Sequence, residues 1–137
     1  MLFRSQKVYA AAQENERFPE IMEDLSSLTV LEKEGNRVVS QWVGVVSAFR
    51  LKIRWTQEDV WDDEAKTCTF RQLSGDFDSM EGEWRFVEED SKTQFTSSVR
   101  YEYSVPGLGQ LASRVIQGLM SKNLDATLAA IGRAAEA

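Results

Sequence analysis

Apolar and polar residues alternate along much of the middle of the chain, and this pattern predicts β-strands. The clearest run is residues 49–61, where Phe49, Leu51, Ile53 and Trp55 alternate with basic residues. Turn-forming residues separate this run from similar ones on both sides. We therefore expect five or six successive strands, at residues 26–33, 37–46, 49–61, 66–73, 79–88 and 93–104.

Helical periodicity replaces this alternation towards both ends of the chain. Residues 6–15 have the pattern of a short helix, and Pro19 stands in the first turn of a second one. After the Pro-Gly pair at 106–107, apolar residues recur every three or four positions, which indicates an amphipathic helix of about thirty residues. Its stripe consists of Leu108, Leu111, Ala112, Val115, Leu119, Leu128 and Ile131, with Met120 and Leu124 nearby.

The order of these elements predicts the fold class. Strands at hairpin spacing form an antiparallel meander, and a sheet with one apolar face needs a cover. The C-terminal helix is the only large amphipathic segment in the sequence. We therefore predict an α+β fold in which a curved antiparallel sheet wraps around the long C-terminal helix. The length favours a single domain over residues 1–137.

Gly82 stands on the presumed inner face of the strand at 79–88, next to Trp84 in the alternation. Glycine weakens a strand interior, so its presence here needs a reason. It can let a strongly curved sheet bend, as Gly44 and Gly75 can, and it leaves room for a pocket between sheet and helix. A β-bulge or a close packing contact explains Gly82 equally well.

The inward positions of the predicted strands and helix have the composition of a ligand pocket, which is mostly apolar and aromatic with a few polar groups. Ordinary core packing is the alternative for each aromatic residue, so the prediction rests on the architecture as a whole. The candidate cavity residues are Trp55, Phe70, Gln72, Gly82, Trp84, Phe86, Phe95, Ser97, Val99, Tyr101, Tyr103, Leu111, Val115 and Leu119.

Composition excludes several classes of chemistry. The chain has no histidine and a single cysteine, Cys68, which removes Ser-His-Asp and Cys-His machinery and the usual zinc sites. We expect no metal and no cofactor. Cys68 lies mid-strand, which favours a buried structural thiol over a nucleophile. The acidic turn at 62–64 is favoured as a solvated hairpin turn over a calcium site, because EF-hand spacing is absent.

The net charge limits the classes of partner that we expect, and the lack of targeting patterns limits the compartment. With 16 basic and 22 acidic residues, the charge is −6, which disfavours nucleic acid and anionic lipid surfaces. The sequence contains neither a long apolar run nor a signal-peptide pattern, so we expect a cytoplasmic protein without stable membrane insertion. A protein partner or a homodimer stays open.

Several motifs occur in a fixed order along the chain: Val8-Tyr9, Arg17-Phe18-Pro19, the strand Thr29–Glu32, and a hairpin with Gly75, Gly82, Trp84 and Phe86, followed by the closing helix. Together they resemble the START-like proteins of the polyketide cyclase/dehydrase and coenzyme-Q-binding group. The similarity extends over residues 6–135. It implies a helix-grip domain that holds a hydrophobic small molecule between sheet and C-terminal helix. Quinones, lipids, sterols and polyketides are the ligand classes that it implies.

The sequence departs from this family at its beginning. The family opens with a full strand before the first helix, whereas only Met1–Ser5 precede it here, so the first strand looks truncated. Residues 2–5, LFRS, also equal the translation of the end of a common sequencing adapter. This gives a second hypothesis, in which these residues are an assembly artefact.

Three functions fit the sequence. The favoured one is binding or carriage of a hydrophobic small molecule, such as a quinone, a lipid or a polyketide-like compound. The alternative is an aromatase/cyclase acting on a poly-ketone, which in this fold is usually assigned an inward arginine with tyrosines. Arg71 has outward parity, although a bulge at Gly75 would reverse it. The third is a protein-interaction role.

Overall fold

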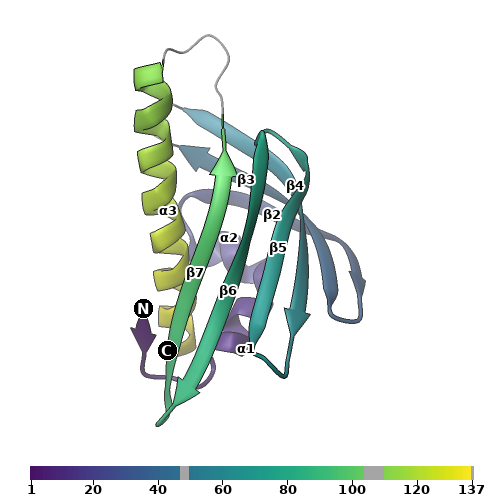
Figure 1. The fold of residues 1–137 in the computed structure, drawn as a ribbon, viewed down its shortest axis with the longest axis vertical. Helices are drawn as coiled ribbons and strands as arrows, with labels where there is room; N and C mark the ends of the chain where they lie inside the picture. The colour runs from purple at the N-terminus through teal and green to yellow at the C-terminus, as the bar shows by residue number, and fades with distance from the viewer. Residues whose placement is uncertain (47–49, 104–109, 137) are drawn as a thin grey trace.

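The computed structural model describes residues 1–46, 50–103 and 110–136. A sheet of seven antiparallel strands runs in the order β1-β7-β6-β5-β4-β3-β2, and a long helix lies across it (Figure 1). The elements are β1 (Leu2–Phe3), α1 (Val8–Gln13), the 3-10 turn η1 (Asn15–Arg17), α2 (Phe18–Ile21), β2 (Leu25–Glu34), β3 (Arg37–Val46), β4 (Leu51–Asp62), β5 (Thr67–Gly75), β6 (Ser79–Glu89), β7 (Lys92–Glu102) and α3 (Gln110–Glu136).

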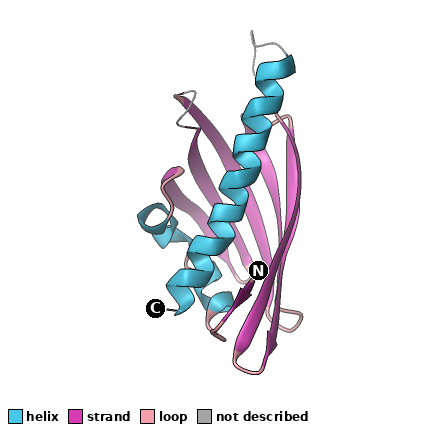
Figure 2. Ribbon diagram, turned by 90° about the vertical axis from the view of Figure 1, so that its left-hand side faces the viewer, coloured by secondary structure: helices cyan, strands magenta, loops and turns pink. Residues whose placement is uncertain are grey.

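The sheet curves around α3, which crosses its concave face (Figure 2). Alternation gives the sheet its two faces, as in β6, where Met80, Trp84 and Phe86 are buried and Glu81 is exposed. Register shifts in the β2–β3 and β4–β5 pairs add bends. The α+β helix-grip fold predicted from the sequence is therefore confirmed, with the predicted strands in the predicted order.

Gly75 marks the bend between β4 and β5. Its φ of +142° is a conformation that residues with a side chain rarely adopt, and a Cβ there would lie 2.5 Å from Trp55 Cα. Glycine is therefore required where the two strands approach each other. The register shift in this pair falls between Thr56 and Gln57, which face Ser74 and Gln72.

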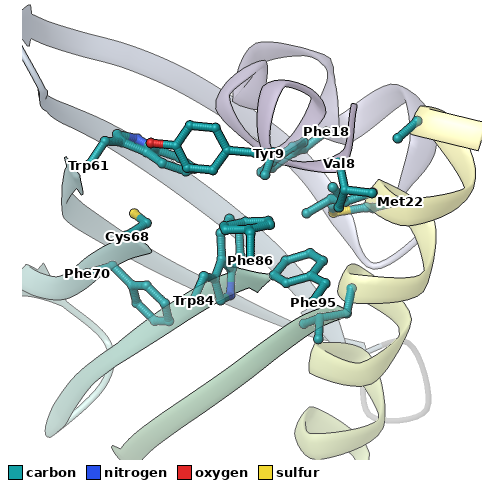
Figure 3. Packing of buried hydrophobic residues seen from close by; sticks show 14 of the residues in the cluster. Val8, Tyr9, Phe18, Met22, Trp61, Cys68, Phe70, Trp84, Phe86 and Phe95 are labelled. Atoms are coloured by element: carbon teal, nitrogen blue, oxygen red, sulfur yellow. The ribbon is translucent and has the colours of Figure 1, made fainter. Parts of the chain in front are cut away.

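The short helices α1 and α2 close one end of the grip, and Figure 3 shows their residues Tyr9 and Phe18 beside the aromatic side chains of the sheet. Tyr9 from α1 packs edge-on against Phe86 and Trp61, with ring centroids 5.2 and 5.5 Å apart. Phe18 of α2 is fully buried and reaches towards Trp42. This end is a filled apolar core.

The N-terminal residues take part in the sheet. β1 is two residues long and pairs with the edge of β7. The Met1 ammonium donates to the Phe95 carbonyl at 2.7 Å, and Phe95 N–H donates to the Met1 carbonyl at 2.8 Å. The Phe3 ring is buried against Gly132 of α3. Part of the β7 edge is therefore covered.

The sequence-based element boundaries agree with the structure to within a few residues. Phe49 at the start of one predicted strand, and the Pro-Gly pair with Leu108 before the last helix, lie outside the described residues. Within the described residues, no helix is long and apolar enough to cross a membrane.

Candidate functional site

A cavity of about 480 Å³ lies between the concave face of the sheet and α3. It separates two apolar clusters. The larger cluster fills the end that α1 and α2 close, and the smaller one contains Val46, Ile53, Tyr103 and Met120 at the other end. Trp55 and Tyr101 pack against both clusters. The cavity is therefore the part of the space between the sheet and α3 that neither cluster fills.

Flat aromatic rings form much of the cavity wall. Trp42 and Trp55, from the paired strands β3 and β4, are stacked with centroids 5.6 Å apart and planes 18° apart. Phe77 meets Trp55 edge-on at 5.2 Å and Tyr101 at 6.0 Å. A wall of this kind suits a planar apolar ligand, because rings stack or meet edge to face.

A hydrogen-bonded series of side chains runs from this wall into the core along β4. The indole Nε1 of Trp55 donates to Gln57 Oε1 at 2.9 Å, and Gln57 Nε2 donates to Asp59 Oδ1 at 2.7 Å. Trp55 and Gln57 line the cavity, whereas Asp59 does not. The three residues occupy successive inward positions of one strand, which places them in a row.

Asp59 is a carboxylic acid inside an apolar core, with 5% of its surface exposed. Burial raises its pKa to about 6, while the Gln57 hydrogen bond lowers the pKa and the neighbouring Glu58 charge raises it. None of the described lysines and arginines forms an ion pair with it. Asp59 is therefore ionised near neutral pH, and its bonded neighbour in this series is an uncharged amide.

The exposed residues that line the cavity are Glu23, Ala126 and Arg133, which places the mouth of the cavity between the α2–β2 segment and α3. In the amide orientation that satisfies both polar atoms of the Asn123 side chain, its nitrogen donates to Asp24 Oδ2 at 2.9 Å and so links the two sides. The Asp24 carbonyl accepts a hydrogen bond from Val45 N–H at 2.8 Å, which holds this segment against β3. We call the Asp24–Asn123 pair the latch.

Six of the residues predicted for the cavity line it in the structure. They are Trp55, Phe70, Trp84, Ser97, Val99 and Tyr101. The Tyr101 hydroxyl donates to the Gln117 carbonyl at 3.0 Å and lies 3.1 Å from Ser121 Oγ, so it fastens β7 to α3.

Other residues predicted for the cavity are part of the filled core. Phe86 and Phe95 stack at 4.4 Å in the larger apolar cluster, and Tyr103 belongs to the smaller one. The Gln72 side chain is occupied with the backbone of Phe77, donating to its carbonyl at 3.0 Å and accepting from its N–H at 3.1 Å. These residues point inward as predicted, but they do not line the cavity.

Gly82, Val115 and Leu119 were also predicted to line the cavity, and they do not line it. A Cβ on Gly82 would lie 2.6 Å from Phe70 Cζ, so the space beside Trp84 is filled by the Phe70 ring and does not belong to the cavity. Val115 is 48% exposed, and Leu119 packs half-buried against the smaller cluster. The Leu111 side chain lies outside the described part of α3.

Trp42 and Gln57 are among the wall residues that sequence reasoning missed. Trp42 shares the inward parity of Val38, Ser40 and Val46, a signal that the predicted strand already contained. Gln57 was detectable because it and Asp59 interrupt an otherwise apolar inward face between Trp55 and Trp61. The α2–β2 segment has no strand periodicity, so its place at the mouth depends on tertiary packing.

The arginine considered for the cyclase and the candidate nucleophile are not at the cavity. Arg71 stays on the outer face, where its Nε donates to Glu58 Oε1 at 3.0 Å, so the register shift in this pair does not turn it inward. Cys68 is a free thiol with 1% of its surface exposed. Burial raises its pKa, with a further contribution from Asp59, and the thiol stays protonated.

Fold and cavity together define a START-like helix-grip domain. The chain belongs to the family described as polyketide cyclase / dehydrase and lipid transport, whose model matches residues 3–127. None of the curated proteins matches the chain.

Solved structures agree with this assignment. TTHA0849 from Thermus thermophilus is 32% identical, with a TM-score of 0.88 over 97% of this chain and 91% of that one. The Zhui aromatase/cyclase from a Streptomyces species is 19% identical, with a TM-score of 0.88 over 99% and 90%. A START superfamily protein from Mycobacterium smegmatis is 12% identical, with a TM-score of 0.78 over 99% and 93%. The last two resemblances show the shared fold alone.

Proposed function

We propose that this protein binds and carries a hydrophobic small molecule, such as a quinone, a lipid or a polyketide-like compound, in the cavity between the sheet and α3. The observation that carries the proposal is the aromatic-walled cavity of about 480 Å³ between two filled apolar clusters. Ligand sites usually have volumes of about 300–1,000 Å³ and mostly apolar walls. The family, which includes lipid transport in its description, supports the same function.

The wall chemistry favours carriage over cyclisation. A cyclase needs an acid and a base that reach the substrate, and a group that stabilises an enolate oxygen. Tyr101 lines the cavity, but its hydroxyl is engaged with α3. Asp59 is separated from the cavity by Gln57, and Arg71 lies on the outer face. Glu23, Asp24 and Arg133 also line the cavity, but at its mouth, so among the described residues no acid–base pair is placed against the aromatic wall for the aromatase/cyclase alternative.

The direct test is native mass spectrometry of the protein purified from its host, followed by organic extraction of the bound compound. Ala126→Trp places a large side chain at the cavity wall without removing core atoms, because Ala126 is exposed and lines the cavity. Ala134→Trp is the matched control, because Ala134 is exposed on the same helix away from the cavity. We expect a stoichiometric apolar compound in the wild type and the control, and its loss in Ala126→Trp.

Three outcomes would overturn the proposal. If the protein retains no compound and also fails to bind a fluorescent apolar probe, the cavity is not a ligand site. If it converts a supplied poly-β-ketone into a cyclised product, the cyclase alternative replaces carriage. Equal binding in Ala126→Trp and wild type would place the ligand elsewhere.

A further inference from the structure

The inward face of β4 contains polar side chains where an apolar face is expected. Trp55, Gln57, Asp59 and Trp61 alternate with outward residues, and the middle two are 6% and 5% exposed. Burying an amide and a carboxyl group costs free energy unless their hydrogen bonds are satisfied. Replacing them with apolar residues would give an ordinary core, so this pair needs a reason beyond packing.

The direction of the hydrogen bonds fixes how Gln57 is oriented. The Trp55 indole N–H is a donor only, so it requires the amide oxygen of Gln57 on its side. The amide nitrogen is then left for Asp59 Oδ1 at 2.7 Å. One N–H and one oxygen lone pair of Gln57 remain beyond these two bonds, and Gln57 lines the cavity. A ligand can therefore meet a polar group of fixed orientation on an aromatic wall.

The charges around this series are mainly negative. Asp59 is close to the Cys68 thiol of β5, which is protonated, and next in the chain to Glu58, whose carboxylate is paired with Arg37 and Arg71. Glu23 and Asp24 line the mouth of the cavity, and Arg133 of α3 is the cation among the described wall residues. Arg133 is exposed, so its charge is screened by solvent. A ligand anion at Gln57 would be repelled by Asp59 through a low-dielectric core.

We propose, on the basis of the proposed ligand-binding function, that Gln57 recognises the polar end of the ligand and that Asp59 is its positioning residue. The Asp59 carboxylate accepts a hydrogen bond from one N–H of Gln57 and thereby polarises the amide group. The Gln57 amide oxygen becomes a stronger hydrogen-bond acceptor as a result. The site therefore selects an aromatic ligand with a neutral hydroxyl, which donates to Gln57 Oε1, over the same ring with a carboxylate. Asp59 contributes through Gln57 and does not touch the ligand.

Three probes with one ring system test this selection. Naphthalene measures apolar binding alone, 2-naphthol adds a neutral hydroxyl, and 2-naphthoate adds a carboxylate. At about pH 7.5 we expect 2-naphthol to bind at least about tenfold more tightly than 2-naphthoate, since one hydrogen bond and one like-charge contact separate them. Gln57→Leu should weaken binding of 2-naphthol about tenfold relative to binding of naphthalene by the same variant. Gln57→Met provides the same test with an unbranched side chain.

The Asp59→Asn variant distinguishes the role of the Asp59 charge from a purely structural role, because the asparagine oxygen can still accept a hydrogen bond from Gln57 Nε2. The preference for naphthol should fall as the pH is lowered from about 7.5 to about 5 in the wild type, because Asp59 takes up a proton. In Asp59→Asn the preference should be smaller and independent of pH over this range. Tighter binding of 2-naphthoate by this variant at the higher pH is the expected signature of the lost charge.

The outcomes distinguish this inference from the proposed function. If naphthalene and 2-naphthol both fail to bind to the wild type, ligand binding itself is refuted. If naphthalene binds but 2-naphthol gains nothing over 2-naphthoate, or Gln57→Leu and Gln57→Met bind 2-naphthol as the wild type does, Gln57 is not the recognition group. A wild-type preference that is unchanged with pH would overturn the role of Asp59.

Discussion

Phe70 and Gly82 are direct cross-strand partners, and the Phe70 ring lies over Gly82 where a side chain would otherwise stand. A Cβ on residue 82 would be 2.6 Å from both Phe70 Cζ and the Ser98 carbonyl oxygen. This arrangement lets the aromatic ring cover a backbone that has no side chain of its own, as happens in strongly curved sheets. The glycine is therefore a packing contact rather than an opening into the cavity.

Gly82→Ala should lower the free energy of unfolding by about 1–3 kcal/mol, because the added methyl group is squeezed between Phe70 and the backbone of Ser98. Urea denaturation followed by tryptophan fluorescence measures the change. Gly118→Ala is the control, since a Cβ there meets nothing within 4 Å and alanine favours the helix by about 0.5–1 kcal/mol. Equal effects at the two positions would show that Phe70 does not press on Gly82.

The buried Asp59 carboxyl group should make stability depend on pH in a distinctive direction. Its pKa is about 6 in the folded protein against an ordinary value of 3.8, so between these values the folded state binds the proton more tightly. The Asp59 contribution to stability is therefore greatest at low pH and is lost as the pH rises through about 6. The difference corresponds to roughly 3 kcal/mol at neutral pH.

Asp59→Asn should accordingly be more stable than the wild type near neutral pH, by up to about 3 kcal/mol, and the gap should close towards about pH 4. The comparison of the two proteins cancels the opposite trend of Glu58, whose pKa is lowered by its hydrogen bonds with Arg37 and Arg71. Denaturant melts at several pH values measure the gap. A gap that stays constant with pH would mean that Asp59 does not titrate in this range.

The Cys68 thiol should react with Ellman's reagent only when the protein opens. It is buried in the larger apolar cluster, and its pKa is raised, so the reactive thiolate is scarce and inaccessible in the folded state. Native protein at about pH 8 should therefore release the chromophore slowly, and urea should make the release fast. A second thiol at the exposed Thr96 (Thr96→Cys) is the control and should react at once. Immediate reaction of Cys68 would contradict its burial.

The strands could be predicted because alternation is a property of the local sequence. β6 shows this well, since Met80, Trp84 and Phe86 had to face one side of any sheet that they joined. The closing helix could be predicted from its stripe, although Val115 on that stripe is exposed. The alternation along a strand assigns each residue to one face of the sheet, but it does not say how much of that face the helices cover.

The cavity was harder to predict because it is what packing leaves over. Phe95 and Trp84 are both inward and lie close together, with ring centroids 5.4 Å apart, yet Trp84 lines the cavity and Phe95 does not. The difference is made by α1 and α2, which fill one end of the grip, and no local pattern specifies where they dock. Gln57 and Asp59 carried a local signal, a polar interruption of an inward face, that composition-based reasoning about pockets overlooked.

The latch should control how fast ligand leaves the cavity, if the protein binds one as proposed. Asn123 holds α3 to the α2–β2 segment through the Asp24 carboxylate at 2.9 Å, at the mouth. Asn123→Asp replaces this hydrogen bond with two like charges, which repel each other and open the mouth. We expect the dissociation rate of a fluorescent apolar probe in stopped flow to rise about tenfold or more, which corresponds to roughly 1.4 kcal/mol.

Two further measurements separate the effect of the added charge in Asn123→Asp from the effect of losing the hydrogen bond with Asp24. Lys122→Ala on the exposed side of α3 is the control, and it should leave the dissociation rate unchanged. Added salt should slow release in Asn123→Asp towards the rate of Asn123→Ala, because it screens the repulsion at a partly exposed mouth. If Asn123→Asp releases the probe at the wild-type rate, ligand leaves by another route and the latch has only a structural role.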